Sequence, residues 1–243
     1  MANLGLLDEL VALPEIWYCI NCRRCGQACP NVVKPWALIE YVRLTAIFRK
    51  NVSWKTVQTC NRLWIQFQKV RWHVVQVCLQ GREIENISEQ QWEKWLDNKI
   101  PEPGGTIHLG NGRPSPDALK IWNQSYLTTS CYTCSECSSL CPASCERGIF
   151  DPSAIVRMAN LGMLEELLVS PSIWLCLECH RCSESCSQKV DSANLIQSIQ
   201  ELSFSSGAVD YGLKIRIEHS MRVAYQRLIE DIDYMMGLSG AHK

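Results

Sequence analysis

Twelve of the fifteen cysteines fall into three runs of identical spacing, and these runs are the part of the sequence best suited to chemistry. Each run reads Cys-x-x-Cys-x-x-Cys-x-x-x-Cys. The members are Cys19, Cys22, Cys25 and Cys29; Cys131, Cys134, Cys137 and Cys141; and Cys176, Cys179, Cys182 and Cys186. Three thiolates at intervals of three residues let one loop wrap around a cubane, because each sulfur can bind a different iron. The spacing therefore predicts [4Fe–4S] clusters.

The fourth cysteine of each run lies too far along the chain to join its own three comfortably. This is the pattern of bacterial ferredoxins, in which the fourth cysteine binds the other cluster of a pair. Pro30 and Pro142 follow the fourth cysteine in two runs, as in that pattern, whereas Ser187 stands in the third. Proline fixes the backbone and is not a ligand, so Ser187 does not change the prediction that the third run binds a cluster.

Two other uses of cysteine fit less well. Zinc needs only four ligands, usually from two separated Cys-x-x-Cys pairs, and three uninterrupted runs hold more thiolates than that. His180 lies inside a run and is interpreted as a solvent-side loop residue rather than a ligand. Disulfides are disfavoured because residues three apart seldom meet the required geometry and the total of cysteines is odd.

The elements that must position these loops are visible as an internal repeat. Residues 1–33 match 158–190 without a gap at an offset of 157, with 17 of 33 positions identical. The unit contains a short helix, a proline turn, an Ile-Trp pair predicted to be buried, and the cysteine loop. Its apolar residues at helical spacing are Leu4, Leu7 and Leu10 in the first copy and Leu161, Leu164 and Leu167 in the second.

A further helix is expected behind each loop. The later copy places Leu195, Ile196, Ile199 and Leu202 on one stripe, and the early copy has Leu38, Ile39 and Val42 at the corresponding positions. The predicted fold is therefore mainly α, with helices built around the clusters. Trp17 and Trp174 directly precede the loops, and we expect them to pack in the core and to exclude water from the cofactors.

Residues 131 to about 207 resemble the C subunit of heterodisulfide reductase. The resemblance rests on the segments CYTCSECSSLCP, FDPSAIVRMANLG and IWLCLECHRCSESC, and residues 1–50 form a half copy. It implies an α-helical ferredoxin with two [4Fe–4S] clusters that passes electrons between a flavoprotein A-like subunit and a catalytic B-like subunit. It also implies two crossed ligand sets: Cys131, Cys134, Cys137 and Cys186; and Cys176, Cys179, Cys182 and Cys141.

The early half copy departs from this family pattern, because Met1 aligns with Met158 and no partner motif precedes Cys19. We still expect a third cluster, since four closely spaced unligated thiols would be prone to oxidation. Its fourth ligand stays open between Cys29 itself, a partner chain, and one of Cys60, Cys78 or Cys145. A misassigned start codon is a further alternative.

The segment 51–127 is a second departure. Between Arg43 and Arg82 there are eight Lys or Arg and no acidic residue, interleaved with aromatic side chains. Single-stranded nucleic acid is a possible partner for such a stretch, but a solvated cationic face, or one that docks on an acidic subunit, is the preferred interpretation. A helix is favoured over 54–67, whereas 72–79 alternates enough for a strand, with helix preferred.

The remaining segments complete the expected organisation. Ser88 with Gln91 forms a capping box, 101–116 is rich in Pro and Gly and predicts a loop, and 217–235 predicts an amphipathic helix that packs on the core or docks a partner. The predicted units are a half-repeat with one cluster loop (1–50), a basic, Trp-rich, irregular insert (51–127), a two-cluster ferredoxin domain (128–207) and a C-terminal helix (208–243).

Composition and missing motifs limit the function. The formal net charge of −1 gives no sign of a nucleic-acid partner, and we expect neither a secretory leader nor a membrane span, hence a cytoplasmic protein. No nucleotide-binding, hydrolase or metalloprotease motif is present, so no catalytic site of its own is predicted. The sequence indicates an electron-transfer subunit, with a sulfur-oxidising relative of heterodisulfide reductase slightly favoured over a methanogen-type or another quinone- or flavin-linked complex. The alternatives are a redox- or oxygen-sensing module and a zinc-bound assembly factor.

Overall fold

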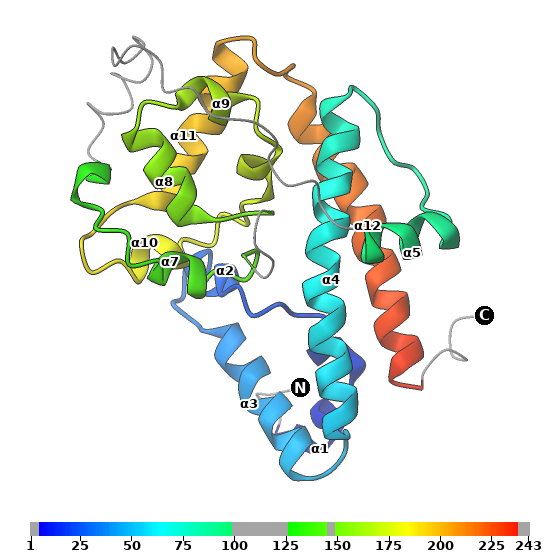
Figure 1. The fold of residues 1–243 in the computed structure, drawn as a ribbon. Helices are drawn as coiled ribbons and strands as arrows, with labels where there is room; N and C mark the ends of the chain where they lie inside the picture. The colour runs from blue at the N-terminus through cyan, green and yellow to red at the C-terminus, as the bar shows by residue number, and fades with distance from the viewer. Residues whose placement is uncertain (1–4, 99–125, 145–148, 238–243) are drawn as a thin grey trace.

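The computed structural model describes residues 5–98, 126–144 and 149–237, and within these ranges it contains helices and no strand. The cysteine loops lie at one side of a pair of long helices (Figure 1). The first loop precedes both of these helices in the sequence, and the other two loops come between them. The mainly α prediction is confirmed. The predicted loop at 101–116 lies outside the described residues.

Both copies of the repeat fold in the same order. Short helices α1 (Leu7–Val11) and α9 (Leu164–Leu168) are each followed by a 3₁₀ turn that starts at a proline, η2 (Pro14–Trp17) and η4 (Pro171–Leu175). Ile16, Trp17, Ile173 and Trp174 are all buried, as predicted. Leu161 is an exception, since it lies beyond the end of α8 and is 60% exposed rather than on the α9 helix. Leu4 lies outside the described residues.

A helix follows each loop, α3 (Pro35–Phe48) in the early copy and α11 (Ser192–Ser205) in the later one. Leu195, Ile196 and Ile199 are fully buried, which confirms the predicted stripe on α11. Val42 is buried on α3, but Leu38 is 42% exposed, so the two stripes are not equivalent. The cause is packing: α11 contacts α8 and α9, whereas the main helix contacts of α3 are with α1 and α2.

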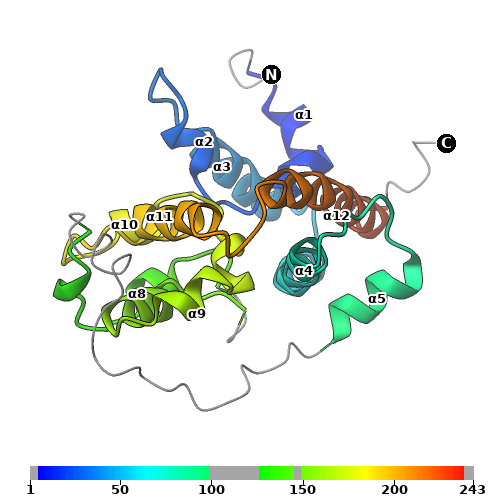
Figure 2. The ribbon, with the colours of Figure 1, turned by 90° about the horizontal axis from the view of Figure 1, so that it is seen from above.

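Helices α4 (Trp54–Leu79) and α12 (Leu213–Met235) run antiparallel side by side and form the longest helix pair in the described chain (Figures 1 and 2). The strand alternative for 72–79 is wrong, because the whole segment belongs to α4. Ser53 caps α4 by accepting a hydrogen bond from the Thr56 N–H at 3.1 Å. Ala224, Leu228 and Ile232 are fully buried on α12, so the prediction that this helix packs on the core is confirmed.

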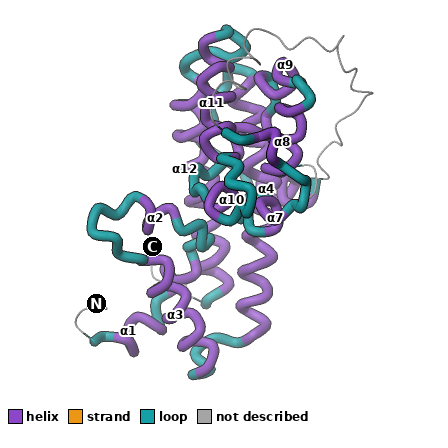
Figure 3. The backbone as a smooth tube through the Cα atoms, turned by 90° about the vertical axis from the view of Figure 1, so that its left-hand side faces the viewer, coloured by secondary structure: helices purple, strands orange, loops and turns teal. Residues whose placement is uncertain are grey.

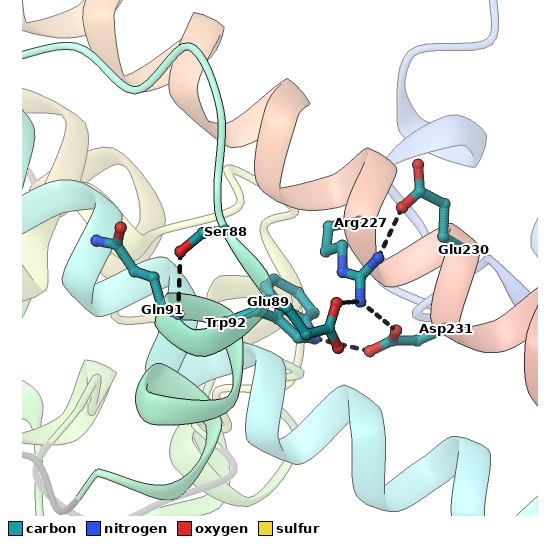
Figure 4. A network of polar contacts seen from close by, with 7 residues as sticks. All are labelled: Ser88, Glu89, Gln91, Trp92, Arg227, Glu230 and Asp231. Carbon is teal, nitrogen blue, oxygen red and sulfur yellow. Dashed lines mark hydrogen bonds and ion pairs between the residues drawn. The ribbon is translucent and has the colours of Figure 1, made fainter.

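Helix α5 (Glu89–Asp97) packs on this pair, and a polar network joins it to α12 (Figure 4). Ser88 accepts a hydrogen bond from the Gln91 N–H at 3.3 Å, which confirms Ser88 as the N-cap. The indole of Trp92 donates to Asp231 Oδ2 at 2.7 Å, and Arg227 contacts Glu89, Glu230 and Asp231. The described part of the insert is therefore two ordered helices that belong to the common core.

The remaining elements surround the two later cysteine runs: η3 (Thr128–Ser130), α7 (Glu136–Ser139), α8 (Pro152–Asn160) and α10 (Arg181–Glu184), with α9 and α11. Figure 3 shows α8, α9 and α11 toward one end of the long helices and α1 and α3 toward the other. Helices α7 and α10 contact each other, as do α8 and α11. The two loop–helix units of residues 128–205 thus form a pair.

Candidate iron–sulfur site

The three cysteine loops share one unusual backbone conformation. The second and fourth residues after the first cysteine have positive φ in every loop: Asn21 and Arg23, Thr133 and Ser135, Glu178 and His180. Non-glycine residues seldom adopt this region, and they cluster at ligand-binding loops. A short helical turn then carries the third cysteine in each case, in α2 (Arg24–Gln27), α7 and α10. All three runs therefore present their cysteines in the same way.

The structure brings Cys141 together with the first three cysteines of the last run. Burial raises the pKa of Cys182 and of Cys141 to about 12 each, and nearby thiols add to both shifts: Cys176, Cys141 and Cys179 act on Cys182, while Cys179 and Cys176 act on Cys141. Burial also raises the pKa of Cys176 to about 11, with Cys179 again contributing. A group of four sulfurs from two loops, with Cys179 and Cys182 buried and Cys141 and Cys176 partly buried, is suited to a thiolate-bound cluster, whose irons would compensate the charge of the thiolates.

The other crossed set is looser. Cys131 and Cys137 lie close enough to interact electrostatically, while Cys134 is exposed and Cys186 is partly buried. The hydroxyls of Tyr132 and Ser187 are hydrogen-bonded at 3.1 Å, which ties the loop of Cys131 to the residue that follows Cys186. Cys186 therefore lies directly before the residue through which its loop contacts the loop of Cys131.

Each of these two loops is clamped to the helix behind it by a serine and an aspartate. Ser138, directly after Cys137, donates to Asp151, the N-cap of α8, and Ser183, directly after Cys182, donates to Asp191 at 2.7 Å. Burial acts to raise the pKa of Asp151, but hydrogen bonds from Ser138 and Ser153 hold it below its usual value. Gly26 and Lys34 occupy the equivalent positions of the early copy, so that loop has no such clamp.

Arginines anchor the turns that precede two of the loops. Arg43 on α3 donates to the Ile16 carbonyl at 2.6 Å and also to the carbonyl of Cys19. Arg71 on α4 is 8% exposed and donates to the Leu175 carbonyl at 2.8 Å. The interpretation of the basic segment as a solvated face is therefore wrong for these two residues. The repeat contains information that could have predicted this role of Arg43. Gln200 is the equivalent of Arg43, and it donates a hydrogen bond at 2.7 Å to the carbonyl of Ile173, the equivalent of Ile16.

The early run lies against the last run. Burial raises the pKa of Cys22, and Cys179 of the last run contributes to this shift as well as Cys19 and Cys25. Cys29 lies just beyond α2 and is partly buried. An apolar cavity of about 360 Å³ lies behind the two loops, with Ile20 and Leu177 in its wall.

The cysteines that are candidates for the fourth ligand of the early run lie in different parts of the structure. Cys60 is buried with its sulfur 3.9 Å from the Trp17 carbonyl, and Arg43 acts electrostatically on both Cys60 and Cys19. Cys78 instead donates to the Ser220 hydroxyl at 3.5 Å, and it lies 18 residues beyond Cys60 on the same helix, about 27 Å away at 1.5 Å per residue. Cys78 is therefore excluded, and Cys145 lies outside the described residues.

Within the described ranges, no three His, Cys, Asp or Glu side chains converge closely enough to bind one metal ion. A cubane makes a different demand, because each thiolate binds a separate iron and the sulfurs need not meet at a point. The same ranges hold no helix that is long and apolar enough to span a membrane.

Comparisons with known proteins address the later part of the chain. A 4Fe-4S dicluster domain family matches residues 128–190. The C subunit of the H(2):CoB-CoM heterodisulfide,ferredoxin reductase of Methanothermobacter thermautotrophicus is 31% identical over 67 residues, which are 28% of this chain and 36% of that protein. The iron-sulfur C subunit of the CoB--CoM heterodisulfide reductase of Methanopyrus kandleri is 28% identical over 78 residues, 32% of this chain and 40% of the relative.

A protein of Archaeoglobus profundus that is named as similar to the heterodisulfide reductase C subunit is 29% identical over 72 residues, 30% of this chain and 38% of the relative. The matches thus span well under half the length of these relatives, and no solved structure matches the chain. The match to the dicluster family ends at Val190 and includes the eight cysteines of the two later runs. In this part of the chain, the paired cysteine loops are therefore similar to those of a 4Fe-4S dicluster domain and to the iron–sulfur C subunits of heterodisulfide reductases.

Proposed function

We propose that this chain relays electrons between a flavoprotein and a heterodisulfide reductase-like catalytic subunit in a cytoplasmic complex. Its role as an iron–sulfur electron-transfer subunit is supported by the dicluster domain and by the named relatives. The observation that carries the proposal is the meeting of Cys141 with Cys176, Cys179 and Cys182, because crossed ligation is the hallmark of paired ferredoxin clusters.

In the proposed ligand sets, Cys131, Cys134, Cys137 and Cys186 hold one cluster, and Cys176, Cys179, Cys182 and Cys141 hold the other. Cys19, Cys22 and Cys25 hold three positions of a third cluster, whose fourth ligand is Cys29, Cys60, Cys145 or a thiolate from another chain. A bound [4Fe–4S] cluster supplies reversible one-electron chemistry. The serine–aspartate clamps fix the two later clusters in place, and burial keeps water from the thiolates of Cys179 and Cys182.

The first test is iron and acid-labile sulfide per chain, with EPR of the reduced protein, on material purified without oxygen. Three clusters give about twelve of each, and two give about eight, since each cluster contains four irons and four sulfides. About eight would leave the relay intact and refute the third cluster. Zinc without sulfide would refute the relay.

A single substitution tests the crossed ligation. Cys141→Ser removes the ligand that comes from the neighbouring loop, so we expect the second cluster to be lost or converted to a three-iron form, with a new EPR signal. Cys78→Ser is the matched control, because Cys78 belongs to no run and its sulfur is hydrogen-bonded to the Ser220 hydroxyl. Full iron content and an unchanged spectrum in Cys141→Ser would contradict the proposed ligand set.

A further inference from the structure

The contacts between the early and the last cysteine loops are arranged as a two-fold pair. Arg24 forms an ion pair with Glu178 at 2.9 Å, and Arg181 donates to the Asn21 carbonyl at 3.3 Å. At the repeat offset of 157, Arg24 is the equivalent of Arg181 and Asn21 is the equivalent of Glu178. Each arginine therefore reaches the same position of the opposite loop, as in an isologous interface between two identical subunits.

Residues on the axis of such an interface meet their own equivalents. Gln27 donates to Glu184 Oε1 at 2.7 Å, and these two residues are equivalent in the repeat. Cys22 and Cys179 are likewise equivalent, and each lies in its loop between the two residues that make the crossed contacts, Asn21 and Arg24 in one loop and Glu178 and Arg181 in the other. The second cysteines of the two runs thus face each other across the axis.

The same relation continues behind the contact. Ile20 and Leu177, a further equivalent pair, both line the apolar cavity, together with Trp64, Phe67 and Tyr225 from the long helices. Tyr225 donates to the Tyr18 carbonyl at 2.6 Å, so α12 holds the early turn. Figure 1 shows α2 next to α10, although the two helices are 157 residues apart. Contacts from both long helices and from both loops therefore fix this arrangement.

We propose that residues 19–29 hold the third cluster directly against the cluster of Cys176, Cys179, Cys182 and Cys141, and that Cys22 and Cys179 are the facing ligands between them. This rests on the proposed function. The three sites then form a row, with the 176–182 site in the middle because Cys141 and Cys186 join it to the 131–137 site. One electron leaves a reduced site and enters an oxidised one, with no bond made or broken and no proton moved.

The row gives the early loop a specific place, which is to extend the two-cluster relay by one site at the face of the molecule that carries α2. A copy of the loop retained only for packing would not need its second cysteine to face Cys179. The distinguishing property is magnetic, because reduced clusters held side by side split or broaden each other's EPR signals. Such coupling depends on the separation of the two sites and not on any assay of activity.

The experiment compares the full-length protein with the variant Cys19→Ser/Cys22→Ser/Cys25→Ser, both anaerobically prepared and fully reduced. We expect iron to fall from about twelve to about eight per chain, a loss of one four-iron cluster. We also expect the variant to lose a splitting that the unmodified protein shows in the signal of the 176–182 site. Loss of four irons without any change in that signal would overturn the inference.

A charge exchange tests the interface itself. Arg24→Glu places two carboxylates together and should weaken the coupling while iron stays near twelve, and the added exchange Glu178→Arg should restore it. Arg49→Glu is the matched control, because Arg49 also forms an exposed ion pair, with Asp8, on the early copy but away from the loops. Equal coupling in all three variants would show that the Arg24 pair does not hold the sites together and would count against the proposed contact.

The outcomes separate this inference from the proposed function. If the unmodified protein and the triple variant both contain about eight irons per chain, the early loop holds no cluster. The inference then fails, while the two-cluster relay stands. If the unmodified protein holds no iron or sulfide at all, the proposed function fails with it.

Discussion

At the residue scale, two equivalent tryptophans share an unusual environment. Trp17 and Trp174 are 4% and 7% exposed, yet neither indole N–H has a hydrogen-bond partner among the described residues. Trp174 packs edge-on against Phe204 with ring centroids 5.2 Å apart, and Trp17 lies under the Arg43 guanidinium. These two side chains therefore stabilise the protein through the packing of their rings and not through a hydrogen bond of the indole N–H.

We expect Trp174→Phe to lower the free energy of unfolding by about 1–2 kcal/mol, because the smaller ring leaves part of the buried space empty, whereas the N–H it removes makes no hydrogen bond within the described residues. Trp174→Ala should cost roughly 3–5 kcal/mol through the cavity it leaves and should also speed the loss of iron in air. Urea unfolding of the anaerobic protein measures the free energy of unfolding, and the absorbance of the cluster followed in air measures the rate of iron loss. A loss of stability in Trp174→Phe as large as that in Trp174→Ala would contradict the assignment to ring packing.

At the scale of elements, the loops depend on the helices that follow them. Asp151 accepts hydrogen bonds from the Ser153 and Ala154 N–H groups at 2.9 and 3.2 Å, so it caps α8 while it binds Ser138 of the cysteine loop. Asp191 has the same double role at α11. A helix cap and a loop anchor are combined in one side chain, which couples the position of the cysteines to the core.

Asp151→Ala should lower the free energy of unfolding by about 1–2 kcal/mol, as loss of an N-cap does, and should also accelerate iron release to a chelator. Ser88→Ala is the control, because it removes the N-cap of α5, which touches no cysteine loop. We expect a similar loss of stability there with an unchanged rate of iron release. Equal release rates in the two variants would argue against the clamp.

At the scale of the whole molecule, the insert and the last helix form the support on which both halves rest. Helix α4 carries Cys60 beside the early turn and Arg71 beside the late one, and α12 binds the early turn through Tyr225. The described part of the insert therefore contributes to the support of both the early and the last cysteine loops. Within this basic, aromatic stretch Arg71 and Phe67 are buried, whereas Arg62 and Trp54 are exposed.

Arg71→Met should weaken the cluster of the last run, because it leaves the buried Leu175 carbonyl without the guanidinium and removes a positive charge near Cys176. We expect a lower reduction potential for that cluster and faster iron release, measured by EPR-monitored titration. Arg62→Met on the exposed face of the same helix is the control and should behave as the unmodified protein. An unchanged potential in Arg71→Met would contradict the assigned role.

The sequence by itself determined the features that depend on neighbouring residues. The spacing of the cysteines, the repeat, the Ser88 cap and the apolar stripes of α11 and α12 all follow from local patterns, and the structure has the helices and buried Ile-Trp pairs where these patterns predict them. The cysteine spacing fixed the cofactor class for the same reason, since a cubane is bound by a short loop.

Only the tertiary structure decided which loops lie together. The contact of the early loop with the last one, the bonds of Arg43 and Arg71 to backbone carbonyls, and the exposure of Leu38 all depend on elements far apart in the chain. An arginine in a basic stretch has the same local pattern whether it faces water or a buried carbonyl. The difference arises from which backbone groups the packing of α3 and α4 leaves without a partner, and no one-dimensional pattern carries that information.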